Sequence, residues 1–199
     1  MTLLRTEDVV SNIRRAMAAL LVLASGATAA AAQEAATAQE AYFGAVAEFF
    51  QLPRSEVGIL GDWRLDVDEI PVVLFVARRA GISPEALVAL RQSGRRWTDL
   101  VVRYGLDASH FHVPLSDQAQ ASVLAEAFAR YRALPANRWS EVTLSDADIV
   151  ALVNVRVLAQ TLGLPPEVVL REAGGGAWHE IYGRLIRDSE ARAPMEIGR

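Results

Sequence analysis

The chain has 199 residues, a formal net charge of −4 and a hydrophobic content of 52%. This composition excludes a disordered polar chain and is enough for a sizeable buried core in one or two domains. Cysteine is absent, which excludes disulfides, thiol catalysis and zinc–thiolate sites. All the basic residues are arginines, and the acidic balance does not favour a nucleic acid as partner.

Residues 1–32 have the pattern of a cleavable export signal. Arg14 and Arg15 precede an apolar, alanine-rich run, and the small residues Ala30 and Ala32 fit a cleavage site. The run is shorter than the roughly 20 strongly apolar residues of a typical membrane anchor. We therefore predict a signal peptide, a periplasmic or secreted mature chain, and no membrane span after cleavage. An ordinary helix or an uncleaved anchor are the alternatives.

Apolar residues recur at helical spacing through the rest of the chain, and no segment has a convincing strand pattern. We expect an all-α domain over residues 33–187 and a flexible tail over 188–199. One helix is predicted over 40–50 and another over 68–80, where Asp68 is the expected N-cap. The second helix is apolar on nearly all sides, which is typical of a helix inside a domain.

A small helical unit is expected to occur twice, over about 63–107 and 139–187, with a linking helix over about 119–133. Each copy would contain a central helix, a glycine corner, a short helix and a helix that begins with tryptophan. The matching residues are Trp63 and Trp139, Leu65 and Leu144, Ile70 and Ile149, Gly81 and Gly163, Trp97 and Trp178, and Arg103 and Arg184. We expect the two central helices to pack against each other about a pseudo-twofold axis.

A helix-ending corner recurs more widely than the unit. It consists of a stop residue, an aliphatic residue, and then a proline or a capping residue, and it begins at Gln51, Gly81, Gly105 and Gly163. Glycine adopts the left-handed conformation that ends a helix, and the aliphatic residue packs back on that helix. Ser83 and Asp107 are expected to cap the helices that follow. Gln51 departs from the pattern, so the first corner is the least regular.

The stretch over residues 74–97 resembles a DNA-binding helix-turn-helix over about 20 residues. One helix ends at Gly81, and the next carries a basic cluster of Arg91, Arg95 and Arg96. A DNA reader needs an exposed basic second helix. The matching helix of the second copy carries one arginine and two glutamates, so the corner is better interpreted as a general helix connection. The three arginines remain a candidate surface for an envelope protein or an anionic envelope polymer.

Two histidines are weak candidates for a metal site. His110 and His112 would share one face of an extended segment, where both rings could bind the same ion. If His110 lies in a short helix instead, the two rings diverge. We assign neither a metal site nor a cofactor.

Two groups of acidic residues are candidates for catalysis: Asp66, Asp68 and Glu69, and then Asp146 and Asp148. Paired carboxylates can hydrolyse glycosidic bonds. These residues lie at predicted helix starts, however, where capping and the helix dipole already favour negative charge. The spacing of Ser145 and Asp148 is that of a capping box. No catalytic residue is assigned.

The four tryptophans, Trp63, Trp97, Trp139 and Trp178, are interpreted as structural anchors, with an exposed aromatic binding surface as the alternative. Together these patterns favour an exported, non-catalytic structural or partner-binding module of the bacterial cell envelope. Whether the protein is an enzyme stays open. The alternatives are an envelope-glycan hydrolase and, if the leader is retained, a helix-turn-helix-like regulator.

Overall fold

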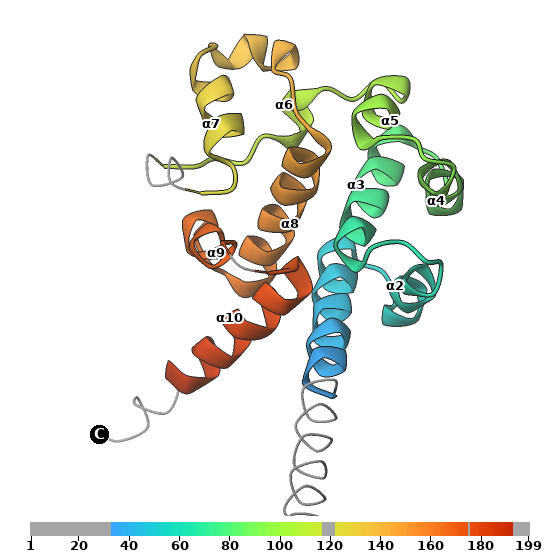
Figure 1. Ribbon diagram of the computed structural model, residues 1–199, viewed down its shortest axis with the longest axis vertical. Coiled ribbons are helices and arrows are strands. Elements are labelled where there is room, and N and C mark those ends of the chain that lie inside the picture. Colours follow the sequence, from blue (N-terminus) through green and yellow to red (C-terminus); the bar gives the residue numbers. More distant parts are fainter. Residues whose placement is uncertain (1–32, 117–121, 175, 193–199) are drawn as a thin grey trace, which may run out of the picture. The chain divides into compact units, whose positions relative to one another are not determined.

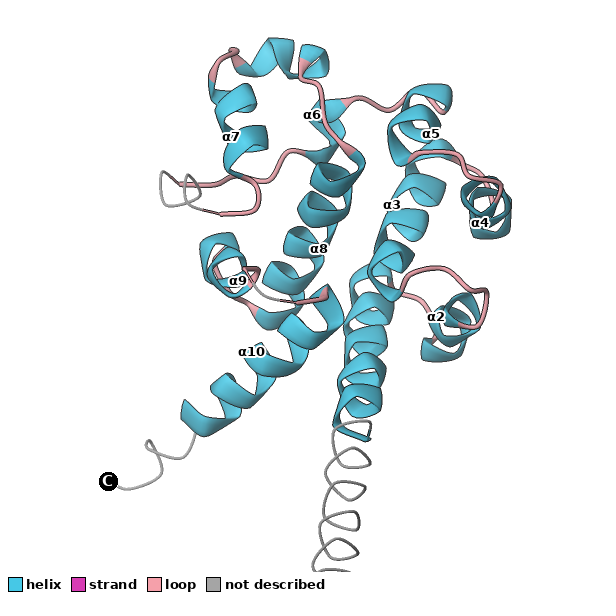
Figure 2. Cartoon of the chain, viewed as in Figure 1, coloured by secondary structure: helices cyan, strands magenta, loops and turns pink. Residues whose placement is uncertain are grey.

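A computed structural model describes residues 33–116, 122–174 and 176–192, and the regular structure in these ranges is entirely helical (Figure 1, Figure 2). The prediction of an all-α fold is thereby confirmed. The chain divides into two compact units, Met1–Thr37 and Ala38–Arg199, and the following description concerns the second. The predicted signal peptide over residues 1–32 lies outside the described residues.

The second unit begins with helical residues 38–50 and continues through short helices and two longer ones. In chain order these are α2 (Arg54–Gly61), η1 (Val67–Glu69), α3 (Ile70–Ala80), α4 (Pro84–Gln92), α5 (Trp97–Arg103), α6 (Ala108–Phe111), α7 (Ala125–Arg132), η3 (Ala136–Glu141), α8 (Asp146–Leu162), α9 (Pro166–Glu172) and α10 (Trp178–Arg192).

Helices α3 and α8 pack against each other in the middle of this unit (Figure 1). Every residue from Ile70 to Ala77 is buried, and α8 buries residues on almost all of its sides. The expectation that the two apolar central helices share one core is confirmed. Among the described residues, no single helix is long and apolar enough to span a membrane, and only α8 joined to α9 across a 117° bend reaches that length and composition.

The four corners close in the same way. Their stop residues are left-handed, with φ of 53° at Gln51, 66° at Gly81, 71° at Gly105 and 62° at Gly163. The next N–H donates to the carbonyl five residues earlier, at 2.9 Å for Leu52, 3.2 Å for Ile82, 2.8 Å for Leu106 and 3.0 Å for Leu164. This is the bond that satisfies the end of a helix in a Schellman motif. Gln51 therefore makes a regular corner without glycine.

Three predicted boundaries were wrong. The helix predicted over 68–80 begins with the separate turn η1, whose N-cap is Asp66 rather than Asp68. The linking helix is α7, which starts only at Ala125, and residues 117–121 lie outside the described residues. Helix α10 continues to Arg192 instead of ending at residue 187, because no glycine or proline interrupts the sequence there.

Candidate functional site

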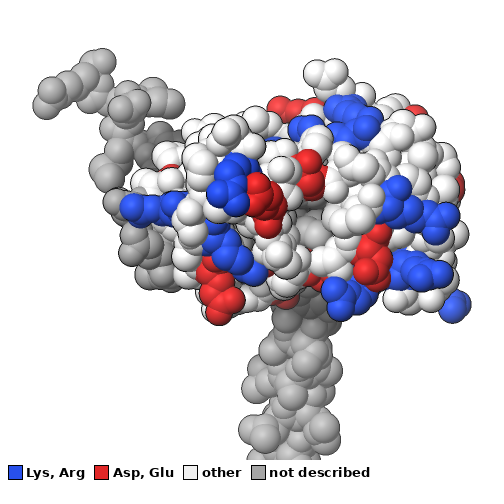
Figure 3. Space-filling model, turned by 90° about the horizontal axis from the view of Figure 1, so that it is seen from above, with Lys and Arg blue, Asp and Glu red and all other residues white. Residues whose placement is uncertain are grey.

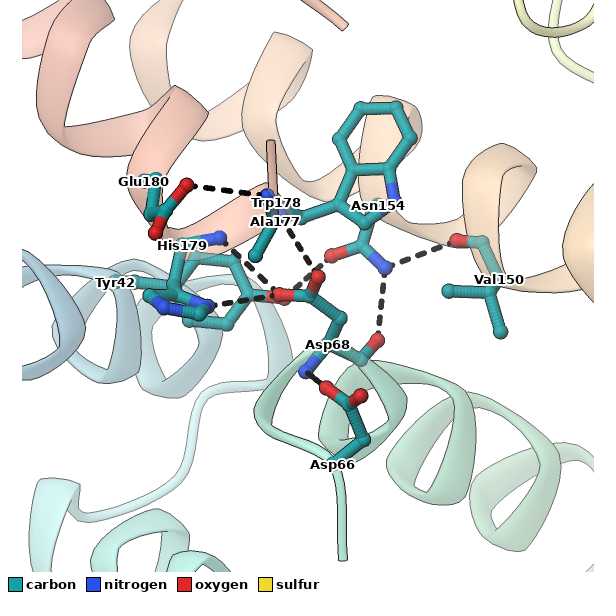
Figure 4. Close-up of polar contacts among 9 residues, drawn as sticks. All are labelled: Tyr42, Asp66, Asp68, Val150, Asn154, Ala177, Trp178, His179 and Glu180. Atoms are coloured by element: carbon teal, nitrogen blue, oxygen red, sulfur yellow. Dashed lines mark hydrogen bonds and ion pairs between the residues drawn. The ribbon is translucent and has the colours of Figure 1, made fainter. Parts of the chain in front are cut away.

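The most extensive polar cluster surrounds Asp68 (Figure 4). Its carboxylate accepts hydrogen bonds from the backbone N–H of Trp178 at 2.7 Å and of His179 at 3.2 Å, and it lies 3.1 Å from Nδ1 of His179. These are the first two residues of α10. Asp68, which was predicted to cap its own helix, thus caps a helix that begins 110 residues later. A carboxylate is favoured at this position because the helix N-terminus presents unpaired N–H groups.

A second aspartate makes the reciprocal contact. Asp146, at the start of α8, accepts from the backbone N–H of Trp97 at 2.9 Å and of Thr98 at 3.0 Å, at the start of α5. Burial raises the pKa of Asp146, but the hydrogen bonds from Thr98 and Trp97 outweigh burial and lower the pKa overall. Each tryptophan-led helix is therefore capped by an aspartate from the start of the other central helix.

Two fully buried polar side chains complete the cluster. The amide of Asn154 donates at 2.9 Å to the carbonyls of both Asp68 and Val150, and its oxygen accepts from the hydroxyl of Tyr42. Burial, followed by the charges of Asp68 and Asp66, raises the pKa of Tyr42 well above its usual value. Tyr42 is thus a neutral donor to Asn154.

The contact between Asp68 and His179 has the arrangement of an acid–base pair, yet its surroundings are structural. In the described part of the chain, no serine, threonine or tyrosine hydroxyl forms a hydrogen bond with the His179 ring. Acyl transfer by such a pair needs a nucleophile within hydrogen-bond reach. The cluster instead joins α10, α8 and the start of α3.

The other acidic candidates are also engaged. Asp148 accepts from the backbone N–H of Ser145 at 2.8 Å, in the predicted capping box, and pairs with Arg130 at 2.9 Å. Glu69 pairs with Arg91 at 2.6 Å. These carboxylates therefore take part in a cap and in ion pairs within the fold.

The two histidines have different partners. His110 lies in α6 and completes a capping box with Asp107, whereas the ring of His112 stacks on Trp139 at a centroid distance of 3.7 Å. Of the two alternatives for this segment, the structure has the short helix at His110, so the two rings diverge. Among the described residues, no group of three or more histidine, aspartate or glutamate side chains is arranged to hold a metal ion.

The three arginines of the basic cluster differ in exposure and in their partners. Arg91 is only partly exposed, since it pairs with Glu69 and lies over the Trp97 ring at 5.6 Å. Arg95 and Arg96 are exposed, and Arg96 donates to the Thr98 hydroxyl at 2.8 Å. Figure 3 shows basic and acidic side chains interspersed over the face it displays. Such a surface lacks the single-sign stripe that is typical of nucleic-acid binding.

The tryptophans fall into two pairs. Trp97 and Trp178 are buried, whereas Trp63 and Trp139 are half-buried and pack against the core. Among the described residues, Nε1 of Trp97 is the one fully buried side-chain nitrogen or oxygen without a hydrogen bond. The half-buried pair keeps part of its ring surface available.

An open pocket of about 600 Å³ lies around Trp139, and the sequence patterns did not indicate it. Its lining is mainly aromatic and aliphatic: His112, Pro114, Leu115, Ser116, Phe128, Tyr131, Arg132, Leu134 and Trp139. The Trp139 indole donates to the Tyr131 carbonyl at 3.1 Å, and the Tyr131 hydroxyl donates to the Ala108 carbonyl at 2.6 Å. These bonds hold both rings in fixed positions.

We expect His112 to make the protein less stable in acid. Burial and then the charge of Arg156 lower the pKa of His112. As the pH falls, the unfolded chain binds a proton at His112 before the folded chain does. The contribution of neutral His112 to stability is therefore complete above the usual histidine pKa, and it is lost as the pH falls toward the lower pKa of the folded state. Urea unfolding at about pH 7 and pH 5 should show a smaller loss of unfolding free energy between the two pH values for His112→Phe than for wild type. An equal loss in both proteins would contradict this role.

The chain matches no protein-family model, no curated protein and no solved structure. The function proposed below therefore depends on the geometry of this chain and on its sequence.

Proposed function

We propose that the protein is an exported, non-catalytic helical module of the bacterial envelope, and that it binds a partner protein through the pocket around Trp139. One observation carries this proposal. The acidic candidates, His110 and His179 are held in caps and ion pairs, whereas the aromatic pocket is open. Pockets lined by apolar and aromatic side chains with few polar groups are typical of binding sites.

The fixed rings of the pocket favour binding of an apolar side chain. Tyr131 and Trp139 are already positioned by hydrogen bonds, so little side-chain freedom would be lost when a partner is bound. Buried aromatic anchors dominate the affinity of many protein interfaces. An exposed leucine, phenylalanine or tryptophan of an envelope protein has the chemistry that this pocket accepts.

We also propose that residues 63–107 and 139–187 are two copies of one unit, related by a pseudo-twofold axis. The reciprocal caps support it, since Asp68 bonds to the start of α10 and Asp146 to the start of α5. The packing of α3 on α8 is consistent with the same relation. Export is proposed from the pattern of residues 1–32 alone.

Site-specific photo-crosslinking in the cell of origin tests the binding site. A benzoylphenylalanine at Ser116, which is exposed and lines the pocket, should give an adduct with an envelope protein. The matched control is the same probe at Ala89, an exposed position of α4 outside the pocket. Leu134→Asp should remove the Ser116 adduct by placing a charge in the pocket. Equal adducts at both positions, or none at Ser116, would refute the proposed binding site.

A further inference from the structure

Two guanidinium groups from different central helices lie close to the same phenylalanine ring. The Cζ atom of Arg79, on α3, lies 4.6 Å from the centroid of Phe75, and that of Arg156, on α8, lies 5.0 Å from it. Arg156 also donates to the carbonyls of His110 at 3.2 Å and His112 at 2.6 Å. These bonds fix the Arg156 side chain beside the end of α6.

This pair of cations has no counter-charge in the described part of the chain. Arg91, Arg130 and Arg138 each form an ion pair, whereas neither Arg79 nor Arg156 does. Burial and then the neighbouring charge of Arg79 lower the pKa of Arg156. Two like charges near each other, one of them partly buried, destabilise the free protein. Such local conflicts are typical of sites that are completed by a ligand.

Several donors of the pair are available to a ligand. Arg79 is exposed, and no hydrogen bond is formed by its guanidinium among the described residues. The Nε of Arg156 has no acceptor either. In the described part of the chain, one side-chain nitrogen or oxygen is both fully buried and without a hydrogen bond, and that atom is Nε1 of Trp97. Because Nε of Arg156 also lacks an acceptor, it is not fully buried. Both side chains can therefore present N–H groups to an anion from solvent.

We propose that Arg79 and Arg156 form a binding site for a phosphate group. The guanidinium fork of Arg79 matches the oxygen geometry of phosphates, and Nε of Arg156 can donate one further hydrogen bond. A phosphate monoester carries a charge of about −1.5 to −2 at neutral pH, which balances two cations, whereas one carboxylate balances a single cation. This site adjoins the aromatic pocket at His112, whose carbonyl Arg156 binds, but the proposed function does not depend on it.

Thermal unfolding of the full chain with inorganic phosphate tests the site. At a concentration tenfold above the dissociation constant, we expect phosphate to raise Tm by roughly 3–5 °C over potassium chloride of equal ionic strength. Arg79→Gln should abolish this difference without unfolding the protein, because Arg79 is exposed. Arg103→Gln, which removes an exposed arginine over the Tyr104 ring, should retain it.

Charge reversal supplies a second readout. Arg79→Glu should raise Tm in the absence of phosphate, because a carboxylate would then neutralise Arg156, and it should remove the phosphate response. Flotation with vesicles of neutral lipid, with and without phosphatidic acid, distinguishes a membrane phosphate from a soluble one. A phosphate response that is equal in wild type, Arg79→Gln and Arg103→Gln, or absent from wild type, would overturn the proposal.

Discussion

Replacing Asp68 with alanine is expected to lower the free energy of unfolding by about 3–5 kcal/mol. The change removes the acceptor for two backbone N–H groups at the start of α10 and the partner of the His179 ring. Part-buried N–H groups that lose their acceptor have neither a protein hydrogen bond nor full hydration, and this destabilises the folded state. Urea unfolding followed by circular dichroism measures the loss.

Two controls make this result specific. Asp66→Ala removes an exposed carboxylate that caps only the local turn η1, and it should cost about 1 kcal/mol. Asp146→Ala should cost about 2–4 kcal/mol, because it uncaps α5 in the same manner. If Asp68→Ala were no more destabilising than Asp66→Ala, the bonds between Asp68 and α10 would not be important for stability.

Trp97→Ala is expected to cost about 3–5 kcal/mol, because the side chain is fully buried and its removal leaves a large cavity. Trp97→Phe should cost much less, at about 1–2 kcal/mol. Phenylalanine keeps most of the apolar surface, and the indole N–H that it removes has no hydrogen-bond partner. Denaturant titration of both variants gives the two values.

The matched substitution at Trp139 separates anchoring from binding. Trp139 is half-buried and its indole N–H has acceptors, so Trp139→Phe should lose both those bonds and reduce the ring area that stacks on His112. We expect a modest loss of stability together with loss of the Ser116 crosslink. A Trp97→Ala protein as stable as wild type would contradict the assignment of Trp97 as a core anchor.

Local signals in the sequence predicted the parts of the fold that depend on local physics. Gly81, Gly105 and Gly163 end helices as expected, and Ser83 and Ser145 cap the helices that follow. The conformational preference of glycine and the reach of a serine side chain act within a few residues, so spacing alone identifies them. The burial of α3 followed from its nearly uniform apolar character.

Contacts between distant segments could not be predicted in the same way. Asp68 has the position of a local cap, and nothing in its spacing distinguishes the start of α3 from that of α10 as its target. The pocket was missed for the same reason, because His112, Phe128 and Trp139 come from separate elements. For the two histidines, the sequence left a short helix and an extended segment open, and the structure has the short helix.

The location and intact mass of the untagged protein in its own cell test the central claim, an exported envelope module, most directly. We expect recovery in the periplasm or medium, with a mass that corresponds to a chain beginning near Gln33. Full-length protein in the cytoplasm would contradict export and an envelope partner. In that case the exposed arginines Arg95 and Arg96 would become the first residues to test for DNA binding.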